Sequence, residues 1–366
     1  MDEQRLAAYL ELIQALLECP NGEENDILNA HRELVDADFV QVMEAEAEKM
    51  AAEGNSNAGW LQNIARYLAN YVRSTPTPQE YLSFLMEVLQ ATSDNSDVNR
   101  QVVYPILKQN IDKLDLNFAQ ILQTAATSIF TQVTSEQAAS FAVDIVNFGN
   151  LIQQFPLRRR AWNLEIRIAC YTAALEVYTR KDYPEQWAVT QNNLGTAYSD
   201  RIAGVRAENI ELAIACYTAA LEVCTRKDYP EDWAMTQNNL ANAYSNRIAG
   251  VRAANIELAI ACYTAALEVR TRKDYPEDWA GTVNNLATAY SGTIAGVRAE
   301  SIELAIACYT EALEVGTREN YPEQWATTQH NLGNAYSNRI EGVRAENIEE
   351  AIDCYREALI VYTRKD

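Results

Sequence analysis

Five cysteines of this chain stand at a constant spacing of 46 residues, at Cys170, Cys216, Cys262, Cys308 and Cys354. Four tryptophans keep the same step, at Trp187, Trp233, Trp279 and Trp325. Aligned at this period without a gap, the chain repeats "WAVTQNNLGTAYSDRI", "WAMTQNNLANAYSNRI", "WAGTVNNLATAYSGTI" and "WATTQHNLGNAYSNRI". A fixed period of this length indicates tandem repeats, each of which buries its apolar face against its neighbours. The spacing therefore predicts a stacked array of repeats.

The repeats occupy only the C-terminal part of the chain. A fainter copy, "FAVDIVNFGNLIQQF", starts at Phe141 in the same register. Residues 1–140 show helical periodicity without the 46-residue step. We therefore predict an N-terminal helical domain over 1–140, either a bundle or degenerate repeats, and five repeats over 141–366. Their expected bounds are 141–186, 187–232, 233–278, 279–324 and 325–366.

The N-terminal region is predicted to be helical throughout. The expected helices cover about 3–18, 22–33, 36–53, 57–73, 78–92, 97–112 and 116–132. "STPTPQE" and "TSDNSD" are the clearest breaks. Pro105 is expected to kink or end its helix, because proline cannot donate a backbone hydrogen bond.

Each repeat predicts two helices, and the second copy shows both. Pro184 begins the first, helix A, with Asp182 or Tyr183 as its N-cap. The expected core side of helix A carries Trp187, Gln191, Leu194, Gly195, Tyr198 and Ile202.

After the turn "AGVRAEN" comes the second helix, helix B. Its predicted N-cap is Asn209, and the equivalent residues are Asn163, Asn255, Ser301 and Asn347. Helix B is expected to bury Ile210, Ala213, Ile214, Tyr217 and Leu221, and its small residues permit close packing.

These residues resemble the tetratricopeptide repeat, whose signature is met by Leu194, Gly195, Tyr198, Ala213, Tyr217 and Ala220. The resemblance covers 141–366, although the period here is 46 residues and the usual one is about 34. It implies an all-α fold, a right-handed α-solenoid of tandem helix-turn-helix repeats, with the A helices lining the concave face.

Long repeats with "NNL" on the first helix look like those of kinesin light chains and of cyanobacterial multi-repeat proteins. In the latter, such arrays often precede a caspase-like CHAT protease domain, and "LLECPNGEENDILNAHRELVDADFV" resembles their leading segment. This resemblance implies an alternative function, the sensor or regulatory half of a CHAT protease system whose catalytic domain is absent from this chain.

One asparagine occurs in all five copies, as Asn147, Asn193, Asn239, Asn285 and Asn331. Packed helices lie roughly 8–10 Å apart, which is close to the ~10 Å spanned by three residues of an extended strand. A carboxamide both donates and accepts, so it can pair with a peptide backbone. The column resembles the asparagine ladder of O-GlcNAc transferase and kinesin light chains, which hold extended peptides.

The leading prediction is therefore a non-catalytic protein–protein interaction scaffold that binds an extended segment in its concave groove. The first asparagine of each pair becomes a histidine in the last copy, where it is expected to tune specificity. The alternative is that each asparagine bonds to a neighbouring helix or loop carbonyl as a structural strut. The predicted groove residues are Asn147, Asn192, Asn193, Thr196, Asn238, Asn239, Asn242, Asn284, Asn285, Thr288, His330, Asn331 and Asn334.

Charge limits the partner. Lys and Arg number 30 against 51 Asp and Glu, a net charge of −21, which disfavours nucleic acid and anionic membranes. The groove positions carry no Lys or Arg, so a clamp for a terminal carboxylate is not expected. A neutral or mildly basic internal segment of another protein fits this acidic chain.

Catalysis finds little support, because the chain has only His31 and His330 and no motif surrounds either. No phosphate-binding loop, HExxH or CxxC motif occurs, so we expect no catalytic residue, metal or cofactor, and the repeated cysteines as small core fillers. A small-molecule or enzymatic role for residues 1–140 remains a third alternative.

Other repeated residues are expected to be structural. The tryptophans should pack beneath the turn between helix B and the next helix A. The arginines of the A–B turns should be solvated or pair with Glu208 or Glu346; they are Arg201, Arg206, Arg247, Arg252, Arg298, Arg339 and Arg344.

The ends of the chain carry two further expectations. The N-terminus begins acidic, unlike a secretory signal, and no segment reaches the roughly 20 apolar residues of a membrane span, so a cytoplasmic protein is expected. The chain stops at "VYTRKD" after the last helix B. That helix is more polar than its predecessors, as a terminal repeat requires, although a homodimer through the C-terminal repeat is an option.

Overall fold

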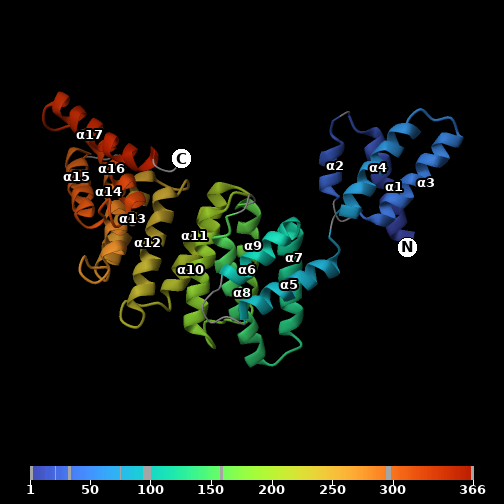
Figure 1. Ribbon diagram of the computed structural model, residues 1–366, viewed down its shortest axis with the longest axis horizontal. Coiled ribbons are helices and arrows are strands. Elements are labelled where there is room, and N and C mark those ends of the chain that lie inside the picture. Colours follow the sequence, from blue (N-terminus) through green and yellow to red (C-terminus); the bar gives the residue numbers. More distant parts are fainter. Residues whose placement is uncertain are drawn as a thin grey trace. The chain divides into compact units, whose positions relative to one another are not determined.

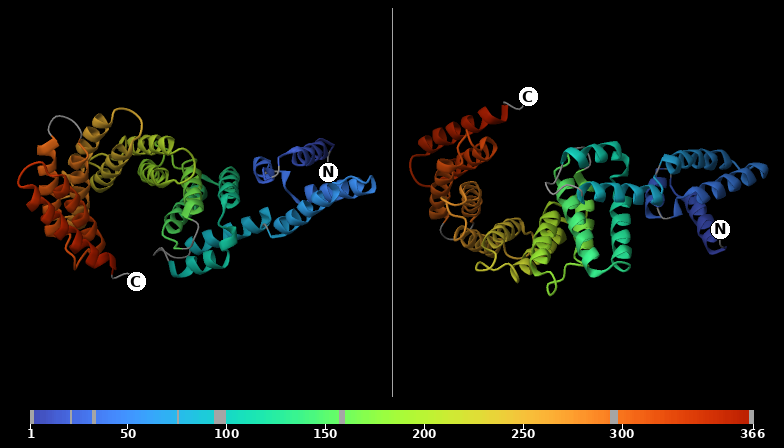
Figure 2. Two further views of the ribbon diagram at one scale, coloured as in Figure 1. Left: turned by 90° about the horizontal axis from the view of Figure 1, so that it is seen from above. Right: turned by 60° about the horizontal axis from the view of Figure 1, so that its bottom comes forward.

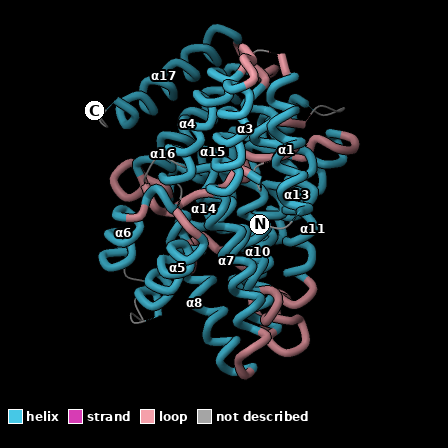
Figure 3. The backbone as a smooth tube through the Cα atoms, turned by 90° about the vertical axis from the view of Figure 1, so that its right-hand side faces the viewer, coloured by secondary structure: helices cyan, strands magenta, loops and turns pink. Residues whose placement is uncertain are grey.

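The computed structural model describes residues 3–20, 22–31, 34–74, 76–93, 100–156, 160–293 and 298–363. This part of the chain contains helices joined by loops and turns, and no strand (Figure 3). The all-α prediction is confirmed. The chain divides into two compact units, Met1–Tyr81 and Leu82–Asp366. The boundary at 140/141, where the sequence predicts that the repeats begin, stays a prediction.

The first unit packs α1 (Glu3–Glu18), α2 (Glu24–Ala30), α3 (Ala37–Ala52) and α4 (Ala58–Ser74) around its own core (Figure 1). Tyr9, Phe39, Met43 and Leu61 are among its largest fully buried side chains. Asp36 caps α3 by accepting from the Phe39 N–H at 2.8 Å, and it also accepts from the Tyr9 hydroxyl at 2.6 Å.

The second unit begins with helices that precede the repeats. They are α5 (Pro78–Ser93), which crosses the boundary, α6 (Arg100–Gln109), the short 3₁₀ helix η2 (Ile111–Lys113) and α7 (Leu116–Phe130). α7 packs against α9. The helix ranges predicted for residues 1–140 agree with these elements within a few residues. Pro105 lies inside α6, which continues beyond it, so the proline does not end the helix.

Five helix pairs then follow one another along the chain (Figure 1). Each pair is the helix A and helix B of one 46-residue copy. In order, the A and B helices are α8 (Ser135–Gln153) and α9 (Arg160–Ala174), α10 (Pro184–Asp200) and α11 (Arg206–Leu221), α12 (Pro230–Asn246) and α13 (Arg252–Leu267), α14 (Pro276–Ser291) and α15 (Arg298–Val315), and α16 (Pro322–Asn338) and α17 (Arg344–Tyr362).

The pairs stack in single file, and within this unit the stack is curved (Figure 2). Each helix B packs against its own helix A, and α9, α11, α13 and α15 also pack against the helix A of the next pair. Successive A helices also contact each other, α10 with α12, α12 with α14 and α14 with α16. Helices converge on the inner side of a curved stack, so these contacts place the A helices there. The solenoid prediction is confirmed.

Small residues set the close spacing within a pair. Ala213 and Ala220 on α11 are fully buried, as is Ala197 on α10. Gly195 faces Tyr217 so closely that a Cβ atom would lie 2.8 Å from the ring. The small residue of the Leu-Gly signature thus lets the tyrosine of helix B pack directly against helix A, and the fully buried Ala241 and Ala287 take this place in two other copies.

The predicted start of helix A is confirmed, whereas that of helix B is wrong. Tyr183 is the N-cap of α10, and Pro184 is its first residue. α11 begins at Arg206 with Val205 as N-cap, so Asn209 lies in its first turn. Asn209 is buried, and its side-chain amide donates to the Ala203 carbonyl at 2.8 Å. The bond forms because the turn before α11 folds back over the start of the helix.

Asn255 and Asn347 make the same bond, to the Ala249 carbonyl at 2.9 Å and the Glu341 carbonyl at 2.8 Å. The predicted caps Asn163 and Ser301 are likewise buried inside their helices rather than at the cap. Ile202 lies beyond the end of α10 and is 60% exposed, so its predicted place in the core is also wrong.

Arginine pairs join successive layers at both edges of the array. At one edge, three arginines each donate two hydrogen bonds, at 2.7–2.8 Å, to a glutamate on the preceding helix B. The pairs are Arg201–Glu165, Arg247–Glu211 and Arg339–Glu303. Glu208 and Glu346, the partners predicted for the arginines of the A–B turns, are therefore wrong for these three arginines, which bind glutamates of the preceding layer instead. At the other edge, the pairs are Arg180–Glu222, Arg226–Glu268, Arg272–Glu314 and Arg318–Glu357.

The repeated tryptophans and cysteines have the expected structural roles. Trp187 packs between two core clusters, and the Arg272 and Arg318 guanidinium groups lie 5.8 Å from the rings of Trp279 and Trp325. All seven cysteines are free thiols. Burial raises the pKa of the Cys216 thiol to about 11, so it stays protonated and unreactive at neutral pH.

Candidate functional site

Paired asparagines form a column across the A helices of the curved stack. The first member of each pair is buried in two layers, Asn192 at 3% exposure and Asn284 at 9%, and half-buried in a third, Asn238. The second members, Asn193, Asn239, Asn285 and Asn331, are half-buried. Helix geometry therefore gives the two neighbours different surroundings.

The column is tied together from layer to layer. The amide of Asn239 donates to the Asn192 carbonyl oxygen at 3.1 Å. Asn285 donates to Asn238 at 3.4 Å and Asn331 to Asn284 at 3.3 Å. The second asparagine of one layer thus bonds to the first asparagine of the layer before it. This is the structural strut that the sequence left open as an alternative.

The first step of the column differs. Val146 occupies the place of the first asparagine on α8. Asn193 instead donates to Asn150 at 3.5 Å, and Asn150 also accepts from the Tyr171 hydroxyl at 2.7 Å. Asn147 is half-buried on α8, and its side chain makes no hydrogen bond to the other described residues.

Four predicted groove residues contact the tyrosine of their own helix B. Tyr217 donates to Thr196 at 3.1 Å, Tyr263 to Asn242 at 2.6 Å and Tyr355 to Asn334 at 2.8 Å; Thr288 and Tyr309 lie 2.9 Å apart. His330 is exposed, with its ring 5.5 Å from that of Tyr355. These side chains are therefore positioned by helix B as well as by helix A.

The column keeps unused acceptors. Within the part of the chain that the structure describes, the side-chain carbonyl oxygens of Asn193, Asn239 and Asn331 accept no hydrogen bond, whereas that of Asn285 accepts from Asn284 at 3.4 Å. A carboxamide oxygen has two lone pairs and accepts readily from a backbone N–H. The struts thus fix the amides in place and leave a row of acceptors on the A helices.

An open pocket of 460 Å³ adjoins this column, and its acidic lining was not foreseen from the sequence. Asn238 and Asn285 line it together with Glu277, Asp278 and Glu323. The carboxylates come from the first turn of α14 and α16, where acidic side chains are stabilised by the helix dipole. The recurring "PEQW" and "PEDW" segments are the signal that could have found this edge.

Arg270 is the one cation among the residues that line this pocket. Its guanidinium lies 3.3 Å from Asp278 and donates to Thr282 at 3.1 Å. The equivalent residues in the neighbouring copies are Cys224 and Gly316. Burial lowers the pKa of Arg270, and Asp278 opposes that shift.

Like charges crowd this edge of the stack. Burial, with Glu185 and Glu231 nearby, raises the pKa of Asp232. Asp232 and Glu231 line a second, smaller hollow that shares Arg270 and Asp278 with the first. A partner cation would relieve this repulsion, whereas a partner anion would add to it.

Among the described residues, none of the helices combines the length and the hydrophobicity that a membrane-spanning segment needs. No group of three or more His, Cys, Asp or Glu side chains in the described segments could hold a metal ion.

Comparison with known families places repeats on the same helix pairs. The tetratricopeptide repeat family matches residues 325–360, which cover most of α16 and of α17. The Sel1 repeat family matches 188–222 and 234–268, which cover most of the second and third pairs. No curated protein matches the chain significantly.

Several solved structures are similar to the chain. BtubC (BKLC) from P. vanneervenii is 20% identical and aligns over 68% of this chain and 90% of its own, with a TM-score of 0.49. The uropathogenic Escherichia coli antigen c5321, described as an SLR fold, is 15% identical over 97% and 69%, with a TM-score of 0.37. The P58(IPK) TPR domain is 16% identical over 99% of both chains, with a TM-score of 0.19.

The stacked helix pairs and the two family matches together define the class: the chain is a tetratricopeptide-type repeat protein. Repeats of these two families indicate a protein-interaction scaffold.

Proposed function

We propose that the inner face of the A helices binds an extended, basic segment of another protein. The observation that carries this proposal is the row of unused carbonyl oxygens on Asn193, Asn239 and Asn331, beside an acidic pocket. The oxygens accept from backbone N–H groups of the segment. The carboxylates of Glu277 and Glu323 attract its Lys or Arg side chains.

Two details modify the sequence-based picture. The amides of Asn193, Asn239 and Asn331 each already donate one of their two N–H groups to a neighbouring layer, and their side-chain oxygens are unused, so these asparagines bind the segment chiefly as acceptors. The acidic edge favours a basic partner over a neutral one, because opposite charges across an interface speed encounter and exclude the wrong partner. The predicted groove residues Asn192 and Asn284 serve as buried supports for the column.

Selection of partners tests this proposal directly. A phage-displayed library of random linear peptides, panned against the full chain, should yield Lys- or Arg-rich sequences without acidic clusters. Changing Asn193, Asn239 and Asn331 together to Ala should weaken the selected peptides by about tenfold or more, since three hydrogen bonds are lost. The matched control changes three exposed threonines, one on helix B of each of the second, third and fourth copies, Thr218→Ala, Thr264→Ala and Thr310→Ala.

The acidic edge has its own variant. Glu185→Gln, Glu231→Gln and Glu277→Gln together should weaken binding and flatten its dependence on salt, because rim charges act through screened attraction. Acidic or compact selected peptides, or equal affinity in the asparagine and threonine variants, would contradict the proposal.

Other predictions stand beside this one. The CHAT-protease role, the ligand or enzymatic role for residues 1–140 and the cytoplasmic location stay predictions. So does the homodimer through the C-terminal repeat, where α17 exposes Leu359 at 55% and Tyr362 at 46%.

A further inference from the structure

Copy one carries a buried arginine that the other copies lack. Arg167 on α9 is 2% exposed, and the same place holds a buried alanine in every other copy, Ala213, Ala259, Ala305 and Ala351. A guanidinium stays protonated at physiological pH, so its charge is permanent. The stack does not require an arginine here, because four layers are built without one.

Arg167 is incompletely paired. Its guanidinium lies 5.8 Å from the centroid of the Tyr171 ring, which covers it from one side. Its Nε has no hydrogen-bond partner among the described residues, and no carboxylate there makes an ion pair with it. A buried charge is tolerated only when it is paired, because desolvation is otherwise uncompensated.

A second buried atom nearby lacks a partner. Asn163, one turn before Arg167 on α9, is 6% exposed, and its side-chain carbonyl oxygen accepts no hydrogen bond from the described residues. Its equivalents, Asn209, Asn255 and Asn347, each donate to the turn before helix B. One donor and one acceptor, both more than nine-tenths buried, are therefore left over on the same stretch of α9.

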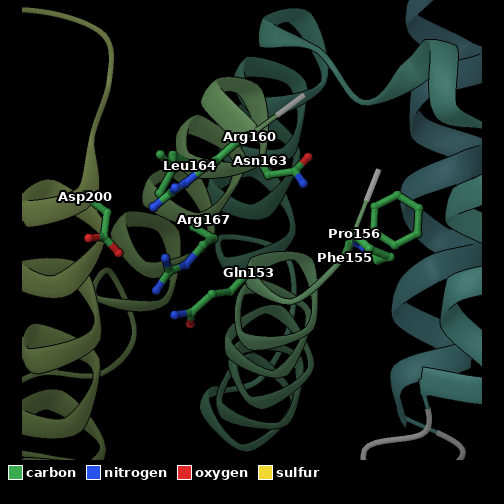
Figure 4. Close-up of a pocket in the computed structure, with 8 residues that line it drawn as sticks. All are labelled: Gln153, Phe155, Pro156, Arg160, Asn163, Leu164, Arg167 and Asp200. Carbon is green, nitrogen blue, oxygen red and sulfur yellow. The ribbon is translucent and has the colours of Figure 1, made fainter. Parts of the chain in front are cut away.

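Both side chains line one open pocket of 420 Å³. Its other lining residues are Gln153, Phe155, Pro156, Arg160, Leu164 and Asp200. Figure 4 shows the Arg167 guanidinium between the side chains of Gln153 and Asp200. This volume lies within the range of pockets that bind small molecules.

We propose that this pocket binds a small carboxylate that also carries a hydrogen-bond donor, as hydroxy- and amino-carboxylates do. The carboxylate pairs with Arg167, with Arg160 adding positive charge at the exposed end. The ligand's hydroxyl or ammonium group donates to Asn163. Asp200 disfavours ligands of high negative charge and favours an ammonium group over a second anion.

Binding of defined probes to the full chain tests the proposal. Calorimetric titration with lactate and malate, and separately with alanine and aspartate, should show saturable binding for at least one hydroxy- or amino-carboxylate. Acetate, which has no donor, should bind at least tenfold more weakly than that probe. The two series distinguish hydroxyl from ammonium as the donating group.

Variants tie the binding to the pocket. Arg167→Ala should abolish binding and should leave the thermal midpoint of the free protein unchanged or raised, since alanine is the residue of every other copy. Arg167→Lys should weaken binding, and Arg272→Ala, a distant exposed arginine, should leave it unchanged.

Three results would overturn the proposal: no saturable binding of any of these carboxylates, binding of inorganic phosphate alone, or equal binding by Arg167→Ala. A lowered thermal midpoint for Arg167→Ala in the absence of ligand would show that the arginine is structural. This test does not involve the asparagine column, so its outcome is independent of the proposed peptide binding.

Discussion

Glu211 and Glu257 offer a matched comparison at the scale of single residues, because they occupy the same place in identical segments, "NIELAIACYTAAL". Glu211 accepts two hydrogen bonds from Arg247, at 2.7 and 2.8 Å. Glu257 has no such partner, since Thr293 stands where the next layer would supply the arginine. The value of the interlayer pair can therefore be measured against an internal control.

Glu211→Gln should destabilise α11 and α12 by about 0.5–1 kcal/mol, the range for partly exposed pairs, whereas Glu257→Gln should be neutral. Amide hydrogen exchange along these helices measures the difference. The hydrogen bond from Arg247 lowers the pKa of Glu211 below its value in the unfolded chain. The stability that the pair contributes is therefore fully present above the unfolded-state pKa and is lost as the pH falls through the folded-state pKa. The effect of Glu211→Gln should vanish as the pH falls through the lowered pKa of Glu211. Equal effects of the two substitutions would show that the Glu211–Arg247 pair does not stabilise the contact between α11 and α12.

The residue scale also marks the limit of prediction from sequence. Periodicity located the asparagines, because equivalent residues must face equivalent neighbours. It did not show which atoms bond, since Asn239 reaches back to Asn192 rather than to its own equivalent. That offset depends on how the layers are tilted. Arg167 escaped notice because one arginine among alanines leaves no periodic signal.

At the scale of elements, Asn255 controls the start of helix B and the turn before it. Its buried amide donates to the Ala249 carbonyl at 2.9 Å. Asn255→Ala leaves that carbonyl without its partner and should cost about 1–2 kcal/mol. Faster amide exchange over the turn and the first residues of α13 would report the loss.

The control is Asn246→Ala, because Asn246 is exposed and bonds only to the Asn242 carbonyl of its own helix. Equal exchange in the two variants would mean that the buried amide does not hold the turn. Sequence alone misplaced this residue because asparagine is a common N-cap. The bond to a carbonyl six residues earlier depends on how the loop folds back.

The number and order of the helix pairs followed from the sequence because each copy repeats the same apolar spacing. The acidic edge did not, because "PEQW" and "PEDW" segments also serve as ordinary helix starts. Only the convergence of α12, α14 and α16 on one side of the stack brings those carboxylates beside the asparagines.

At the scale of the whole molecule, the stacking of helix pairs within the second unit confines the destabilising effect of a substitution to the neighbouring pairs. Ala305 on α15 is fully buried against the fifth pair. Ala305→Leu should overpack that interface and cost about 1–3 kcal/mol. Because each repeat contacts only its neighbours, exchange should rise in α15, α16 and α17 and stay unchanged in α8 and α9. A uniform rise along the unit would contradict a stacked array.

Photo-crosslinking of a selected peptide tests most directly whether the inner face is the binding surface. A photoreactive amino acid is placed at Thr327, which lines the acidic pocket, and in a second protein at Leu258, which is 43% exposed on helix B. If the inner face is the binding surface, a Lys- or Arg-rich peptide from the phage selection crosslinks at position 327 and not at 258, and excess unlabelled peptide abolishes the product. Crosslinking at 258 alone, or equally at both positions, would contradict binding at the inner face.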